Sequence, residues 1–330
     1  MLFVTNRTPR QSERTRTNRP IDFPLQNTSV SQNLYFCRRN GPDDYTEIGS
    51  PAFFAELKEL SDPKTQVLLY IHGFNNTFES EIFPNAQQLQ SLFDQHGGKG
   101  LVHVVPLIWP CDDDSFVAFI DDYWDDQRAA DASGDAFARM LGKFDDWRKA
   151  EAEACKKEDR PPCTRRINVL AHSMGNRVLR NALRRWVHND IGQMPQLFRN
   201  CFMVAADVVN HTLEPDEEGA VISDAARNLV VYFANDDLAM PASKLANLKN
   251  KTVSRRLGMT GPEDLEKVAR NVFEVDCDNF NNSFDPPKGH SYFLTNPKGK
   301  VSPVLLHMVK AVKTGRVDPS DRSHILAKPK

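Results

Sequence analysis

The sequence lacks several features that would assign it to a specialised class of protein. Its 330 residues contain no apolar run near the ~20 residues of a membrane-spanning helix, and the apolar start at 1–4 is too short for a signal peptide. The six cysteines include no C-x-x-C pair, which argues against a zinc site and a redox motif. No glycine-rich dinucleotide-binding or phosphate-binding motif follows an apolar segment. We therefore expect a cytoplasmic protein that uses no metal and no cofactor and does not insert stably into a membrane.

The charged residues give no overall signal for a polyanionic partner, because the formal net charge is only -2. The first forty residues hold seven arginines against two acidic residues, but no aromatic residues are interleaved with them. We interpret this segment as a solvated loop rather than a nucleic-acid site. The aspartates between 112 and 126 lack the glycine and the terminal glutamate of an EF-hand loop, so we expect them near the start of a helix. A small molecule is thus the expected partner, and the oligomeric state is left open.

Apolar segments of strand type alternate with segments of helical periodicity along the chain. The predicted strands are 33–37, 66–71, 101–109, 167–171, 201–206, 229–234 and 272–275. Helices are predicted at 53–60, 86–93, 123–147, 178–186 and 304–312, with a charged surface loop at 150–162. This alternation predicts an α/β fold in which right-handed crossovers build a mostly parallel sheet with helices on both faces.

The lengths of the segments indicate one large domain. We expect a single domain at 1–315 and a C-terminal tail at 316–330. The segment 241–270 is longer than a simple connection, so it is either a cap over a site or a surface excursion with its own small core.

The segment INVLAHSMGN at 167–176 leads a predicted strand into Ser173 and then into a predicted helix. A serine in this place could be a helix N-cap. It could also be a nucleophile on a sharp strand-to-helix turn, which requires small residues two positions before and after it. Ala171 and Gly175 meet that requirement, and the buried strand before the turn favours the nucleophile.

A serine nucleophile needs a base to remove its proton and an acid to orient that base. His290 lies in the predicted loop between the last strand and the last helix, where an accessible base is expected. For the acid, Asp237 or Asp236 directly follows a predicted strand, and Asp207 at the end of the preceding strand competes with them.

The oxyanion of an acyl intermediate needs backbone N–H donors, usually one after the nucleophile and one from an earlier strand–helix loop. Met174 would supply the first donor. Gly73 allows the earlier loop to turn, and Phe74 or Asn75 would supply the second.

With these residues assigned, the chain resembles the bacterial family of α/β hydrolases of unknown function called DUF900. The motifs that carry the resemblance are TNR at 5–7, YIHGFNNTF at 70–78, IWP at 108–110, AHSMGNRVL at 171–179, AADVV at 205–209, YFANDDLAM at 232–240, RLGMTGP at 256–262 and GHSYF at 289–293. The resemblance implies an α/β-hydrolase fold with Ser173 as nucleophile, His290 as base and Asp237 as acid, with Asp236 as the neighbouring alternative. It implies no particular substrate.

The sequence therefore predicts a serine hydrolase that cleaves a carboxylic ester or a related acyl compound through an acyl-enzyme intermediate. A non-catalytic interaction protein on a hydrolase fold remains an alternative. So does an acyltransferase with the same triad, which would differ only in the exclusion of water.

Overall fold

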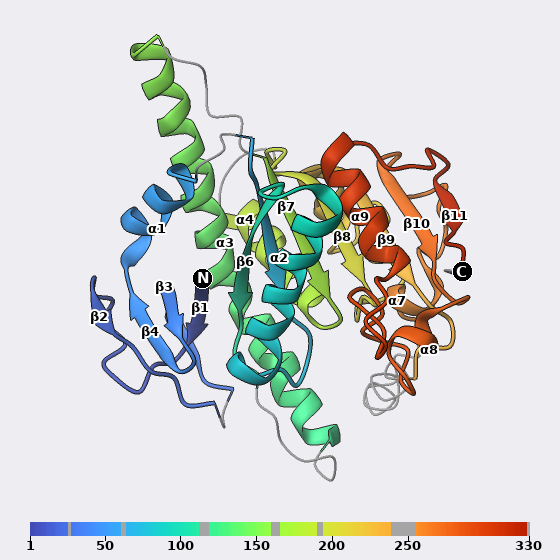
Figure 1. Ribbon diagram of the computed structural model, residues 1–330, viewed down its shortest axis with the longest axis horizontal. Helices are drawn as coiled ribbons and strands as arrows, with labels where there is room; N and C mark the ends of the chain where they lie inside the picture. The colour runs from blue at the N-terminus through green and yellow to red at the C-terminus, as the bar shows by residue number, and fades with distance from the viewer. Residues whose placement is uncertain are drawn as a thin grey trace.

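The computed structural model describes residues 1–25, 28–60, 64–111, 119–159, 166–189, 194–238 and 255–328, with the backbone alone at 119–124 and 189. In these residues eleven strands form one sheet (Figure 1). From one edge to the other they are β11 (Ser323–Ile325), β10 (Val272–Asp276), β9 (Ala226–Phe233), β8 (Phe198–Val204), β7 (Ile167–His172), β5 (Gln66–Ile71), β6 (Val102–Ile108), β1 (Leu2–Arg7), β3 (Val30–Gly41), β4 (Asp44–Glu47) and β2 (Arg19–Pro20).

Every neighbouring pair from β11 to β1 is parallel, whereas β3, β4 and β2 form an antiparallel extension. The mostly parallel α/β fold is thus confirmed. The strand β1 was not predicted, and β3 extends well beyond the predicted 33–37. All six residues of β1 are buried, because the strand lies inside the sheet and both of its faces are covered.

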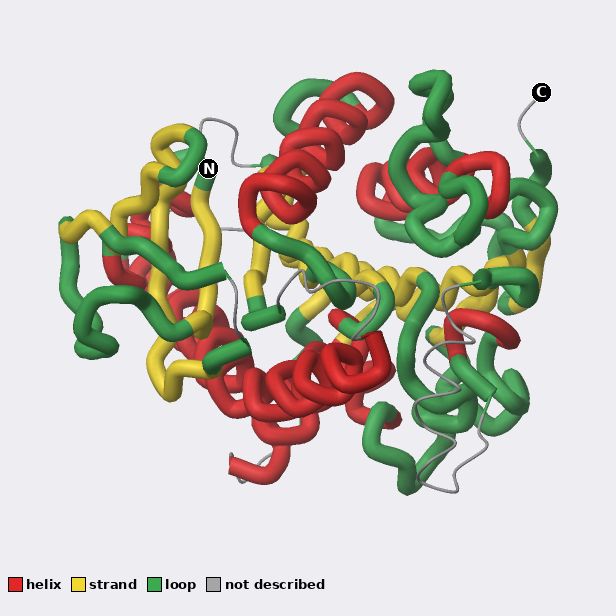
Figure 2. The backbone as a smooth tube through the Cα atoms, turned by 90° about the horizontal axis from the view of Figure 1, so that it is seen from below, coloured by secondary structure: helices red, strands yellow, loops and turns green. Residues whose placement is uncertain are grey.

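Helices cover both faces of the sheet, as Figure 2 shows from below. One face carries α1 (Gly49–Lys58), α3 (Phe119–Lys157), α4 (Gly175–Asn189) and α5 (Ala220–Ala225), and the other carries α2 (Phe83–Gly97) and α9 (Pro303–Thr314). Shorter helical segments are η1 (Phe78–Ile82), α7 (Leu257–Thr260) and α8 (Asn281–Phe284). A hydrophobic core lies on each face of the sheet: the first core beneath α1, α3, α4 and α5, and the second core beneath α2 and α9. Successive side chains of β5 point to opposite faces, so Leu69 and Ile71 pack in the first core and Leu68 and Tyr70 in the second.

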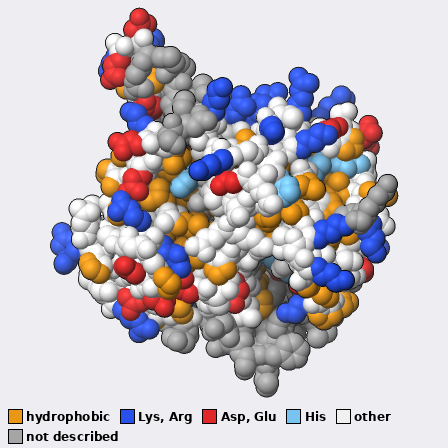
Figure 3. Space-filling view, viewed as in Figure 1, with side chains coloured by type: hydrophobic (Ala, Val, Ile, Leu, Met, Phe, Trp, Pro, Cys, Tyr) orange, Lys and Arg blue, Asp and Glu red, His pale blue; other side chains and the backbone are white. Residues whose placement is uncertain are grey.

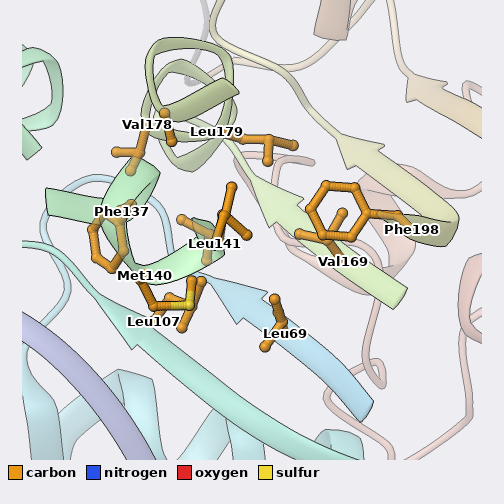
Figure 4. A pocket seen from close by; sticks show the side chains of 11 residues that line it. Leu69, Leu107, Phe137, Met140, Leu141, Val169, Val178, Leu179 and Phe198 are labelled. Atoms are coloured by element: carbon orange, nitrogen blue, oxygen red, sulfur yellow. The ribbon is translucent and has the colours of Figure 1, made fainter. Parts of the chain in front are cut away.

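The core beneath α3 and α4 is closely packed. A small void in it has a volume of about 10 Å³ and is lined entirely by apolar side chains, including Leu141, Val169 and Phe198 (Figure 4). That space is about one water-sized sphere, too small for a substrate.

Two predicted loops are regular structure instead. Helix α3 continues to Lys157, so the segment predicted as a surface loop from 150 is helical for another two turns. Its Ala, Glu and Lys residues favour a helix even without an apolar stripe, and Lys149 pairs with Asp145 one turn away at 2.6 Å. The predicted tail at 316–330 contains β11, which pairs with β10 at the sheet edge.

The segment 241–270, for which the sequence left a cap and a surface excursion open, is described only in its second half. Residues 239–254 lie outside the described residues. From 255 onward the segment belongs to the main body, because Leu257 is fully buried and donates its N–H to Val208 at 2.9 Å. Gly258 donates to Ala206 and accepts from Ala234, and a side chain at this position would overlap the backbone of Ala205.

Among the described helices none is both long and apolar enough to span a bilayer.

Candidate active site

The two strands that carry the predicted nucleophile and oxyanion loop are neighbours. The chain runs from β5 to β6 on one side of β5, and later places β7 on the other side. This reversal is a topological switch point, and ligands bind to parallel sheets beyond the strand ends at such a point. Ser173 follows β7 and Gly73 follows β5, so both lie at this position.

Ser173 occupies a strained turn. Its φ is +52°, a left-handed conformation that is uncommon for serine and typical of a nucleophile elbow. A Cβ at Gly175 would lie 2.5 Å from the carbonyl oxygen of His72, so only glycine allows α4 to begin so close to β5. The Asn176 side chain fixes the turn by donating to the carbonyls of Ala171 at 2.9 Å and Ser173 at 3.1 Å.

The loop after β5 lies directly against Ser173. A Cβ at Gly73 would lie 3.0 Å from Ser173 Cβ and 2.9 Å from His172 Nδ1, so a side chain here would push the loop away. Phe74 is half-buried beside this contact, and Met174 is fully buried at the start of α4. The N-terminal end of a helix carries partial positive charge and therefore favours an anion near Met174.

His72 holds this loop in place, a role that the sequence did not indicate. Its ring stacks on Trp109 at 5.1 Å, and the Trp109 backbone N–H donates to His72 Nε2 at 3.2 Å. Because Nε2 accepts, Nδ1 carries the proton and donates to the Gly73 carbonyl at 2.9 Å. Burial lowers the pKa of His72 to about 3, so the ring stays neutral. The bond fixes the plane of the Gly73–Phe74 peptide and therefore the direction of the Phe74 N–H.

His290 and Asp237 form a close pair at the carboxyl end of β9. His290 Nδ1 lies 2.6 Å from Asp237 Oδ2, and the carboxylate is 1% exposed. The Asp285 carboxylate anchors the same loop by accepting the N–H groups of His290 at 2.9 Å and Ser291 at 2.8 Å. Burial alone would lower the pKa of His290, but the charge and hydrogen bond of Asp237, helped by Asp285 and Asp207, raise it above its ordinary value.

His172, the residue before Ser173, connects β7 to the loop of His290. Its Nε2 donates to the His290 carbonyl at 3.4 Å, and the centres of the two rings are 4.9 Å apart. Burial first, and then the neighbouring His290, hold the pKa of His172 well below its ordinary value, so it stays neutral. The backbone of His290 is therefore held by the residue adjacent to Ser173.

The other predicted acids have different partners. Asp207 Oδ1 lies 3.3 Å from Arg256 Nε, and both side chains are buried. Asp236 is exposed and accepts hydrogen bonds from the side chains of Asn281, at 2.7 Å, and Asn282. Asp237 is the candidate that bonds His290.

No cluster of three or more His, Cys, Asp or Glu side chains in the described part of the chain could hold a metal ion. The buried His72 and His172 and the half-buried His290 are engaged with backbone or carboxylate groups instead.

A mostly parallel sheet, with a strained serine and an Asp–His pair at the ends of its strands, defines the chain as an α/β hydrolase in fold. Residues 52–307, more than three quarters of the chain, match the model of the family described as alpha/beta hydrolase of unknown function, DUF900. The chain therefore belongs to this family, as its motifs indicated. A search of curated proteins finds no match.

Proposed function

We propose that the protein is a serine hydrolase that cleaves a carboxylic ester or a related small acyl substrate. The observation that carries the proposal is the 2.6 Å contact between His290 Nδ1 and a buried Asp237, at the same sheet edge as Ser173. An aspartate that accepts from Nδ1–H leaves Nε2 unprotonated and able to accept a proton.

In the proposed reaction Ser173 Oγ attacks the substrate carbonyl carbon while its proton passes to His290 Nε2. The tetrahedral intermediate carries its negative charge on the former carbonyl oxygen, which accepts from the N–H groups of Met174 and Phe74. The C–O bond to the alcohol then breaks, and His290 returns the proton to the leaving oxygen. Water attacks the acyl-enzyme by the same route, and the acid product leaves with Ser173 restored.

The environment of the three histidines supports a single base. His72 and His172 have pKa values lowered by burial, so both stay neutral and serve as hydrogen-bond donors to carbonyls. His290 has a raised pKa and a carboxylate partner, so it is the histidine suited to gain and lose a proton near neutral pH.

The decisive experiment is labelling of the full chain by a fluorophosphonate probe. The wild type and Ser320→Ala, which removes an exposed serine, should label equally, and Ser173→Ala should not label. A panel of acyl esters of increasing chain length then gives the substrate range. Equal labelling of folded Ser173→Ala would contradict the proposal, and absence of labelling and turnover in the wild type would favour an interaction protein.

Acyl transfer is distinguished by its products. When an alcohol is added as a competing acceptor, a hydrolase yields the free acid, whereas an acyltransferase yields the new ester.

A further inference from the structure

Three arginines meet at the amino ends of the central strands, the edge opposite Ser173. Arg166 directly precedes β7, and Arg199 and Arg227 are the second residues of β8 and β9. In the register of β8 with β9, Phe198 pairs with Ala226 and Asn200 with Asn228, so Arg199 and Arg227 lie side by side. Figure 3 shows Lys and Arg side chains gathered along the upper edge, where Figure 1 places the beginnings of the central strands.

The charge of this cluster is not neutralised within the described part of the chain, where none of the three guanidinium groups has an ion-pair partner. The Nε of Arg199 is buried there and has no hydrogen-bond partner. Burial first, and then repulsion from Arg166 and Arg227, lower the pKa of Arg199. Like charges on adjacent strands destabilise a sheet, so the cluster lowers the stability of the fold.

Folding explains only one of the three cations. The Arg199 guanidinium lies against Gly315, which ends α9 in a left-handed conformation. A single cation near the last carbonyls of a helix is favourable. Arg166 and Arg227 are both exposed and add two more positive charges at the same place.

We propose that Arg166, Arg199 and Arg227 form a binding site for a phosphate-type oxyanion. Planar guanidinium groups donate pairs of N–H groups that match phosphate oxygens, and a dianion would neutralise most of the cluster. The six residues of β7 separate this site from Ser173 by about 20 Å. The site is therefore distinct from the proposed active site and does not depend on the proposed function.

The phosphate group could belong to a soluble phosphorylated compound or to the headgroup of an anionic lipid. The arginines would bind the same phosphate oxygens in both cases. Inorganic phosphate and vesicles of phosphatidylcholine with or without phosphatidic acid therefore serve as separate probes.

The first measurement is thermal unfolding of the full chain at low ionic strength. Inorganic phosphate should raise the Tm of the wild type more than sodium chloride of equal ionic strength does. Arg166→Gln with Arg227→Gln should raise the Tm without phosphate by about 1–2 °C, because repulsion is removed, and should abolish the gain specific to phosphate. A cluster that binds no phosphate would show no gain specific to phosphate in either protein.

The matched control replaces Arg14 and Arg148 by Gln, which removes the same charge from two exposed arginines elsewhere. Titration calorimetry with inorganic phosphate and sedimentation with the vesicles should show binding at least about tenfold weaker in the Arg166/Arg227 variant than in this control. Phosphate binding without vesicle binding assigns a soluble ligand, and vesicle binding that requires phosphatidic acid assigns a headgroup. Equal binding by the two variants, or no binding by the wild type, overturns the proposal, and Ser173→Ala should bind as the wild type does.

Discussion

At the scale of single residues, two adjacent aspartates have opposite environments. Asp237 is buried against His290, and Asp236 is exposed to solvent. We predict that Asp237→Asn lowers kcat/KM by about 10³–10⁴-fold, since the amide cannot hold the imidazole in the required tautomer. Asp236→Asn is the matched control and should change kcat/KM by less than about threefold. The rates of ester hydrolysis by the two purified variants measure both effects. A larger loss of kcat/KM in Asp236→Asn than in Asp237→Asn would show that Asp236, not Asp237, is the acid.

The raised pKa of His290 gives a prediction for pH dependence. The base accepts a proton only when neutral, so kcat/KM should rise with pH and level off above the pKa of the free enzyme. Because Asp237 raises that pKa above the ordinary 6.5, the midpoint of the acid limb should lie above pH 6.5. A profile measured with an uncharged ester tests this, and a midpoint below 6.5 would show that another group limits the rate.

His72 gives a third prediction. His72→Phe keeps an aromatic ring against Trp109 but removes the donor to the Gly73 carbonyl. If this bond aims the Phe74 N–H at the oxyanion, kcat should fall by about 10–100-fold with little change in KM. The loss of the bond to the Trp109 N–H should also cost about 1–3 kcal/mol of stability. Kinetics and urea unfolding separate the two effects, and lost stability with unchanged kcat would leave His72 a purely structural role.

At the scale of elements, a ladder of amide side chains crosses the amino ends of four strands. Asn168 donates to Gln66 at 3.1 Å, Asn200 to Asn168 at 2.7 Å, and Asn228 to Asn200 at 2.8 Å. Gln66 in turn donates to the Val312 carbonyl in α9 at 3.0 Å. These bonds fix the register of β5, β7, β8 and β9, which apolar side chains alone specify weakly when both faces are buried.

Asn200 is the inner member of this ladder. We predict that Asn200→Ala lowers the free energy of unfolding by about 2–4 kcal/mol, because it removes the donor to the Asn168 side-chain oxygen and the nearer acceptor of the Asn228 amide, both buried. Asn40→Ala, on an exposed part of β3, should cost less than about 0.5 kcal/mol. Urea denaturation measures both, and equal losses would mean that the ladder contributes nothing specific.

The elements that the sequence predicted well are those with a strong apolar pattern. The predicted strand at 66–71 coincides with β5, and the predicted helix at 304–312 lies within α9. The apolar pattern did not predict strands that form only because of their neighbours in the sheet. β1 is one short run that becomes a strand only between β6 and β3, and β11 has only three residues that pair with β10.

The residues of the candidate site likewise fall into those that the sequence located and those that only the fold reveals. The turn at Ser173 and the loop of His290 could be located because strand ends and small residues mark them. The choice between Asp236 and Asp237 could not be made without the resemblance, since only the register of the loop decides which carboxylate is buried. The supporting contacts of His72, His172 and Asp285 needed the folded chain, because each joins segments far apart in sequence or depends on a backbone carbonyl or N–H group.

At the scale of the whole molecule, the extent of the family match differs from the extent of the folded unit. The match covers residues 52–307, yet β1 lies inside the sheet and buries Phe3 and Val4 completely. The match also ends within α9, before the buried Met308 and Val312. The hydrolase unit therefore needs segments at both ends that the family match does not include.

We predict that a fragment of residues 52–307 does not fold cooperatively. Without β1 the strand β6 becomes an exposed, apolar edge, and without the end of α9 the second core opens, so the fragment should aggregate. Thermal unfolding followed by circular dichroism, together with fluorophosphonate labelling, compares the fragment with the full chain. A cooperative transition and full labelling in the fragment would mean that β1 and the end of α9 are dispensable. Because β1 is buried on both faces and contributes Val4 to one core and Phe3 to the other, we expect neither a cooperative transition nor full labelling of the fragment.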